Sequence, residues 1–164
     1  EGDRVFKHET SDMTTVLNIG YEIGASFFRC VGNDHTPTAF PVSSAVAIAG
    51  KNLDSIMSDT TLSRSILIDM VKAKSGQIRQ KFKKKRHLSR LQELGRKLKR
   101  WCDDHRTDCG NYEPNFPDTL DDRDEDNWTS LVAIASVASD EIGIRAMNIA
   151  IDKSSLAEEL DGDY

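Results

Sequence analysis

Strand-type and helix-type segments do not alternate along this chain, because the strand-type segments all come first. Four runs within the first 71 residues are rich in β-branched, aromatic or small apolar residues, which is the composition of strands. We expect strands over residues 25–31, 38–42, 44–49 and 65–71. The first two form a hairpin in this interpretation. The continuous apolar run 44–49 is typical of a strand that is buried on both faces.

Helical periodicity dominates after residue 72, whereas one helix, from Asp12 to Gly24, and a single helical turn over residues 54–60 are expected before it. The later helices are expected over residues 77–85, 88–104, 128–138, 142–151 and 154–160. One face of the helix 88–104 is apolar at helical spacing, and we expect that face to lie in the core. Its members are Leu88, Leu91, Leu94, Leu98 and Trp101.

Strands followed by helices only predict a chain of two parts. We expect residues 1–71 to be part of an α/β sheet domain and residues 72–164 to be a helical lid or bundle. The chain has 164 residues, begins at Glu1 without a methionine and ends at Tyr164 without a helix stop. We therefore expect it to be a piece of a longer protein.

The net charge of −5 conceals three blocks of opposite sign. Counted along the chain, residues 1–71 carry −4, residues 72–107 carry +11 and residues 108–164 carry −12, which together give −5. The basic block is the place to look for a polyanionic partner, because a local patch sets the field that such a partner meets. The candidate nucleic-acid-binding residues are Lys81, Lys83, Lys84, Lys85, Arg86 and Arg90.

The basic block has two interpretations that the sequence leaves open. Its side chains could follow a phosphate backbone, in which case binding weakens steeply with salt. They could instead form a solvated face that balances the acidic tail. We find no interleaved aromatic residues, which argues against stacking of bases.

Several kinds of site are excluded by their missing motifs. The Gly50-Lys51-Asn52 tripeptide lacks the earlier glycine and the following hydroxyl residue of a phosphate-binding loop, so the chain has no Walker A motif. The three cysteines show no zinc-ligand spacing and are expected to be reduced thiols. No apolar run is long enough to cross a membrane, and no signal peptide is visible, so we expect no membrane partner and a cytoplasmic protein.

The remaining polar clusters have plain structural interpretations. The four histidines stand among polar neighbours, and we expect each to be solvated. The acidic run 121–126 could bind a metal, but carboxylates in the first turn of a helix also complement its dipole, and we favour the helix start. We therefore predict no metal site. Arg64 directly precedes the expected strand 65–71, where an arginine is by default an exposed residue.

Six segments occur in order along the chain, at residues 18–25, 29–31, 40–42, 47–50, 59–66 and 120–128. Together they resemble the domain of unknown function at the C-terminal end of helicase- or primase-associated ATPases of phages, plasmids and integrated elements.

The resemblance implies the last strands of an AAA+-like P-loop sheet, followed by a helical lid. It implies that the sensor position falls at Gly50, Lys51 or Asn52, of which we select Asn52, and that Arg64 reaches the γ-phosphate of a neighbouring subunit. It also implies that Arg123 is a second nucleotide sensor, although Arg123 could instead be a helix-entry residue paired with Asp122 or Asp126. ATP and magnesium are then expected only together with an upstream nucleotide-binding lobe. DNA and further copies of the protein are the partners implied for the complete protein.

Three functions follow from these observations. The first is a part of a mobile-element replication ATPase of helicase or primase type, which would not hydrolyse ATP alone. The second is a standalone nucleic-acid-binding or protein-docking helical module without catalytic activity. The third is an interaction domain whose acidic and basic segments pair within a homo-oligomer.

Overall fold

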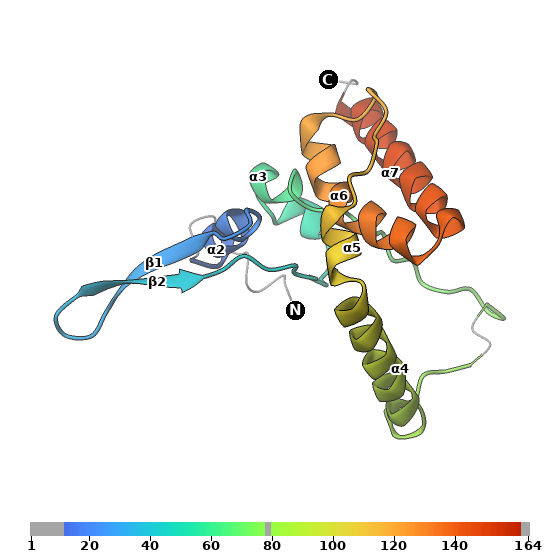
Figure 1. The fold of residues 1–164 in the computed structure, drawn as a ribbon, viewed down its shortest axis with the longest axis horizontal. Helices are drawn as coiled ribbons and strands as arrows, with labels where there is room; N and C mark the ends of the chain where they lie inside the picture. Colours follow the sequence, from blue (N-terminus) through green and yellow to red (C-terminus); the bar gives the residue numbers. More distant parts are fainter. Residues whose placement is uncertain (1–11, 78–79, 162–164) are drawn as a thin grey trace. The chain divides into compact units, whose positions relative to one another are not determined.

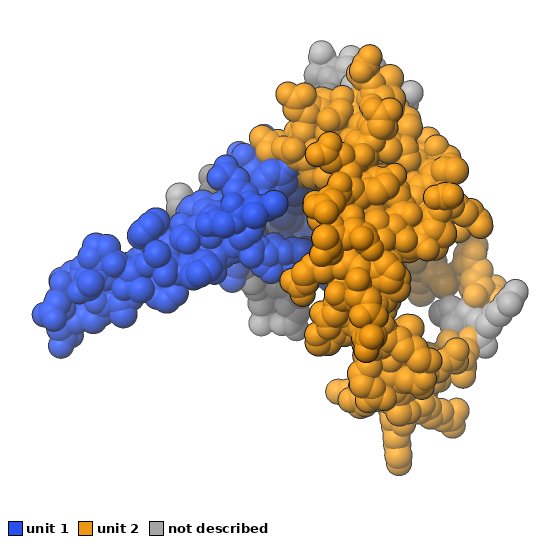
Figure 2. Space-filling view, in the orientation of Figure 1, with its two compact units in different colours: residues 1–67 blue, residues 68–164 orange. Residues whose placement is uncertain are grey.

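The computed structural model describes residues 12–77 and 80–161 of the chain. The chain divides into two compact units, residues 1–67 and residues 68–164, which are coloured separately in Figure 2. Unit 1 contains α2 (Asp12–Gly20), β1 (Ser26–Val31), β2 (Thr36–Pro41), the 3-10 turn η1 (Leu53–Ser55) and α3 (Asp59–Leu62). Unit 2 contains α4 (Lys84–Asp104), α5 (Arg106–Asn111), α6 (Asp122–Ala138) and α7 (Asp140–Asp161), as labelled in Figure 1.

Unit 1 is built around an antiparallel hairpin of β1 and β2, which confirms the predicted hairpin. The strands pair from Ser26 opposite Pro41 to Val31 opposite Thr36. The turn between them needs two residues with positive φ, Gly32 at 77° and His35 at 50°. At the other end of the hairpin, a Cβ on Gly20 would stand 2.7 Å from the carbonyl oxygen of Val42, so only glycine fits where α2 meets the chain after β2.

A hydrogen-bonded group joins α2 to α3 in unit 1. The hydroxyl of Thr61, which is buried, donates to the side-chain oxygen of Asn18 at 2.9 Å. Ser58 caps α3, since its side chain accepts from the backbone N–H of Thr61. Among the described residues of unit 1, the large apolar side chain that is buried is that of Met57.

The prediction of an AAA+-like sheet is wrong. The described residues contain a two-stranded sheet, and the expected strands 44–49 and 65–71 are irregular and largely exposed. Within them Val46 is 60% exposed and Met70 is 88% exposed. A strand buried on both faces exists only between neighbouring strands and covering layers, and the hairpin does not extend to supply them. Over residues 12–77 and 80–161 the fold is mostly helical with one hairpin, not α/β.

Unit 2 has its core between α6 and α7, which pack along their lengths. Trp128 and Val132 are one helical turn apart on α6, and Ala150 on α7 is fully buried. Gly143 of α7 is also buried. Small residues on α7 let the two helices approach closely, and this pair is the scaffold of unit 2.

Several helix boundaries differ from the predicted ones. The helix expected over 77–85 is absent from its described residues except for its last two, and α4 begins at Lys84. The two helices expected over 142–151 and 154–160 are one continuous helix, α7. No proline or glycine separates them, so nothing interrupts the hydrogen-bond ladder.

The apolar face of α4 does not lie in the core. None of the residues of α4 is buried, and Leu91, Leu94 and Leu98 are 49%, 52% and 56% exposed. The helical period was therefore predicted correctly, but the burial of this face was not. Among the described residues, no helix has both the length and the hydrophobicity needed to cross a membrane.

Candidate nucleic-acid interface

Helix α4 forms because its sequence combines good helix formers with an apolar stripe. Leucine, lysine, arginine, glutamine and glutamate make up most of its 21 residues. The helix ends at His105, whose ring stacks on Trp101 with ring centroids 4.6 Å apart.

The start of α4 is organised by His87. The backbone N–H of Lys83 donates to Nδ1 of His87 at 2.9 Å, so the neutral imidazole carries its proton on Nε2. The same ring lies 5.4 Å from the ring of Phe82. The expectation that every histidine is simply solvated is wrong for His87 and His105, which are half-buried and in contact with neighbours. The feature of the sequence that could have predicted this contact is the spacing of four residues between Lys83 and His87, which is one helical turn.

A group of cations surrounds this helix start, and we name it the basic cluster. All of its side chains are exposed, and within the described part of the chain none of them forms an ion pair. Its members are the predicted nucleic-acid-binding residues Lys81, Lys83, Lys84, Lys85, Arg86 and Arg90.

The cations in the second half of α4 are arranged differently. Lys97, Lys99 and Arg100 each pair with a carboxylate four residues away, at 2.8, 2.6 and 2.7 Å. The hydrogen bond from Lys99, together with the charges of Lys99 and Arg106, holds the pKa of Asp103 below its usual value. These cations are locally neutralised, whereas the basic cluster is not.

The order of charges along α4 opposes the helix dipole. A helix is favoured by acids in its first turn and bases in its last turn. The first turn of α4 holds Lys84, Lys85 and Arg86 without an acid, and the last turn holds Asp103 and Asp104 without a base. This order of charges lowers the stability of the isolated helix. Sequences that depart from such a local preference are expected at functional surfaces.

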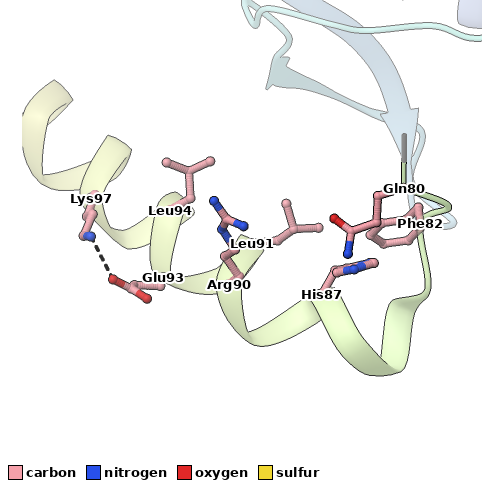
Figure 3. Close-up of a pocket in the computed structure, with 8 residues that line it drawn as sticks. All are labelled: Gln80, Phe82, His87, Arg90, Leu91, Glu93, Leu94 and Lys97. Carbon is pink, nitrogen blue, oxygen red and sulfur yellow. Dashed lines mark ion pairs between the residues drawn. The ribbon is translucent and has the colours of Figure 1, made fainter. Parts of the chain in front are cut away.

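A shallow hollow lies beside the basic cluster, between α4 and the segment that precedes it (Figure 3). Phe82, His87 and Gln80 gather at one end of it, and Leu91 and Leu94 extend along the helix from there. Phe82 is 62% exposed and stands between Lys81 and Lys83. The interpretation that no aromatic residue lies among the cations is therefore wrong, since the exposed ring of Phe82 lies within the basic cluster.

The family of the chain is shown by comparison with known families. A model described as "Protein of unknown function (DUF3631)" matches residues 69–161, more than half of the chain. The chain belongs to the DUF3631 family. No curated protein and no solved structure matches the chain.

The DUF3631 match spans helices α4 to α7, so the basic cluster and the α6–α7 scaffold both belong to it. The resemblance to a domain of unknown function is confirmed. The association of that domain with helicases or primases is not part of the match and stays a prediction.

The acidic run of the DUF3631 region lies at a helix start, as favoured from the sequence. Asp121 caps α6 by accepting from the backbone N–H of Asp124 at 2.7 Å, and Asp122, Asp124 and Glu125 stand in the first turn. Asp124 also accepts a short hydrogen bond from Ser154 of α7. Across residues 12–77 and 80–161, no group of three or more acidic, histidine or cysteine side chains is placed to hold a metal.

Of the three residues assigned through the resemblance, Asn52 and Arg64 lie in unit 1 and Arg123 lies in unit 2. Arg64, in unit 1, donates from Nη1 to the carbonyl of Thr60 at 2.9 Å, and its guanidinium carbon lies 5.7 Å from the centre of the Tyr21 ring. Asn52 is exposed and adopts a left-handed conformation before η1. Arg123 of the DUF3631 region is half-buried in the first turn of α6. Their roles toward a nucleotide stay predictions.

Proposed function

We propose that the DUF3631 region of this chain binds nucleic acid through the basic cluster. The observation that supports this proposal is the contrast along α4. Three of the four cations in its second half, Lys97, Lys99 and Arg100, are neutralised by carboxylates four residues away, whereas the exposed cations at its start have no acid in the first turn beside them. Cations and the positive end of a helix dipole both attract anions.

The dimensions of the cluster fit a polyanion better than a single small anion. The helical part of the cluster, from Lys84 to Arg90, rises by about 9 Å at 1.5 Å per residue. One strand of DNA carries a phosphate about every 3.4 Å, so about three phosphates lie along that length. Several cations can therefore contact successive phosphates without a change in the fold of α4.

Phe82 favours single-stranded nucleic acid over a duplex. Its ring is exposed between two lysines, and it is steadied by the neighbouring ring of His87. An unpaired base can stack on such a ring while the adjacent cations hold the backbone. We therefore propose sequence-tolerant binding of single strands, with phosphates as the main contacts.

The test compares two variants of equal charge. The cluster variant carries Lys83→Gln, Lys84→Gln, Lys85→Gln and Arg86→Gln. The control variant carries Lys97→Gln, Lys99→Gln, Arg100→Gln and Arg106→Gln, which removes four cations that are paired with carboxylates.

Binding of a labelled single-stranded oligonucleotide is measured by fluorescence anisotropy at low salt. We expect the cluster variant to weaken binding by on the order of tenfold or more, and the control variant to weaken it much less. Equal losses in the two variants would mean that overall charge, not the cluster, drives binding. Absence of binding by the unmodified chain would overturn the proposal.

We propose as the setting of this module a mobile-element replication ATPase of helicase or primase type. The support is the resemblance of residues 59–66 and 120–128. In that setting ATP and magnesium bind an upstream lobe, and the basic cluster binds DNA. Arg64 reaches the γ-phosphate of ATP in a neighbouring subunit, and Asn52 and Arg123 sense the bound nucleotide. Arg64 is half-buried, with its guanidinium carbon 5.7 Å from the centre of the Tyr21 ring, and this partial exposure is compatible with such a role.

A further inference from the structure

The segment that leads into α4 presents its side chains alternately to two sides. Gln80 and Phe82 line the hollow beside the basic cluster, whereas Lys81 and Lys83 do not line it. The backbone at Lys83 is extended, with φ −131° and ψ 112°, and successive side chains of an extended chain point to opposite sides. One side of this segment is therefore cationic, and the other side faces the hollow with a ring and an amide.

Phe82 gives the hollow a flat apolar surface. Its ring is 62% exposed, and the ring of His87 lies against it with the centroids 5.4 Å apart. Leu91 continues the apolar surface along the helix (Figure 3). The hollow has a volume of about 480 Å³, which lies in the range of sites for small molecules. A single nucleobase therefore fits against the ring of Phe82.

The polar groups at the same end of the hollow include hydrogen-bond donors. Nδ1 of His87 accepts from the backbone N–H of Lys83, so Nε2 carries the proton and is a donor. The exposed amide of Gln80 offers an NH₂ donor and a carbonyl acceptor. Adenine and guanine both present the acceptor N7, which cytosine and thymine lack. A purine therefore satisfies these donors better than a pyrimidine does.

The charges around the hollow indicate what the base is attached to. Arg90 lines the hollow, and Phe82 stands between two lysines of the basic cluster. The carboxylate that lines the hollow, Glu93, is paired with Lys97 at 2.8 Å at the other end (Figure 3). A nucleic-acid strand carries each base between phosphates, so it matches a ring that is flanked by cations. This charge complementarity favours a base within a strand over an apolar peptide.

We propose that the hollow binds one unpaired purine base of the strand that the basic cluster holds. Phe82 stacks on the base, and the donors of Gln80 and His87 hydrogen-bond its N7 edge. This inference rests on the proposed function, because the cations hold the strand in place. Phosphate contacts carry no sequence information. The hollow therefore adds a preference at one nucleotide to binding that is otherwise tolerant of sequence.

The first experiment compares three short oligothymidine strands that differ in the central base, using the full chain and fluorescence anisotropy at low salt. The central base is adenine, thymine or 7-deaza-adenine, in which a C–H group replaces N7. We expect the adenine strand to bind on the order of fivefold more tightly than the other two, which is the effect of one hydrogen bond. Equal affinities for the adenine and 7-deaza-adenine strands overturn this inference and leave the proposed function standing. Absence of binding to all three strands overturns both.

The second experiment tests whether the hollow is the origin of the preference. The variants are Gln80→Ala and Phe82→Leu, and the matched control is Gln92→Ala, since Gln92 is exposed on α4 and does not line the hollow. We expect Gln80→Ala to remove the difference between the adenine and 7-deaza-adenine strands, and Phe82→Leu to weaken binding of all three strands. None of these changes alters a charge, so the salt dependence of binding should stay that of the unmodified chain.

Two results would overturn the inference even if strands bind to the chain. The first is a Gln80→Ala variant that keeps the full preference for adenine, because the preference would then arise outside the hollow. The second is a dimer in sedimentation equilibrium that no strand dissociates and that shows no preference for adenine, because a second copy of the chain would then occupy the hollow.

Discussion

The substitution Gly143→Ala probes the packing on which unit 2 rests. A Cβ at Gly143 would stand 2.5 Å from Oγ of Ser136, 2.8 Å from its Cα and 3.0 Å from its Cβ. The hydroxyl can rotate away, but Cα belongs to the backbone of α6, so α6 and α7 must move apart locally. Such overpacking costs about 1–3 kcal/mol, whereas alanine regains up to about 1 kcal/mol of helix propensity over glycine.

The balance predicts that Gly143→Ala lowers the free energy of unfolding by about 1–2 kcal/mol. Urea denaturation followed by tryptophan fluorescence measures it, because Trp128 is buried between the same helices. Gly110→Ala in α5 is the control, since a Cβ there meets nothing within 4 Å. If Gly143→Ala is as stable as the unmodified chain, α6 and α7 do not approach as closely as described.

Two further predictions concern single side chains. Because the pKa of Asp103 is lowered, its ion pair with Lys99 stabilises the end of α4 at pH values above the ordinary pKa of an aspartate carboxyl. This stabilisation is lost as the pH falls through the lowered pKa. An NMR titration of the Asp103 carboxyl should give a midpoint below the ordinary value, and Lys99→Gln should return the midpoint toward it; a midpoint at the ordinary value contradicts the ion pair. In the complete protein, Arg64→Ala should abolish ATP turnover and leave nucleotide binding nearly unchanged, and unaltered turnover would refute the role proposed for Arg64.

The features that were predicted correctly depend on neighbours close in sequence. Gly32 ends the first strand of a local hairpin, and Asp121 caps α6 three residues from its hydrogen-bond donor. Trp128 and Val132 are one turn apart on a helix whose partner, α7, follows directly in the chain. Such short-range signals can be interpreted without knowledge of the rest of the fold.

The features that were predicted wrongly depend on partners far away or outside the chain. Residues 44–49 have the composition of a buried strand, but composition does not provide the neighbouring strands that burial requires. The apolar face of α4 has the period of a core face, yet period alone does not say whether another element covers the face. The exposure of the Phe82 ring was not predicted, because an apolar ring is expected to be buried unless nothing in the fold covers it. The contact of His87 was not predicted, because a ring nitrogen that accepts from a backbone N–H is a detail of local geometry.

The central claim is that the basic cluster binds nucleic acid through its contacts with phosphates. The most direct test is the salt dependence of binding, measured as the slope of log affinity against log salt concentration for the unmodified chain and for the cluster variant. For single strands each phosphate contact contributes about −0.7 to this slope. Removing four contacts should therefore make the slope shallower by about 2.8, while the control variant keeps nearly the slope of the unmodified chain. Equal slopes for the unmodified chain and the cluster variant would contradict the claim.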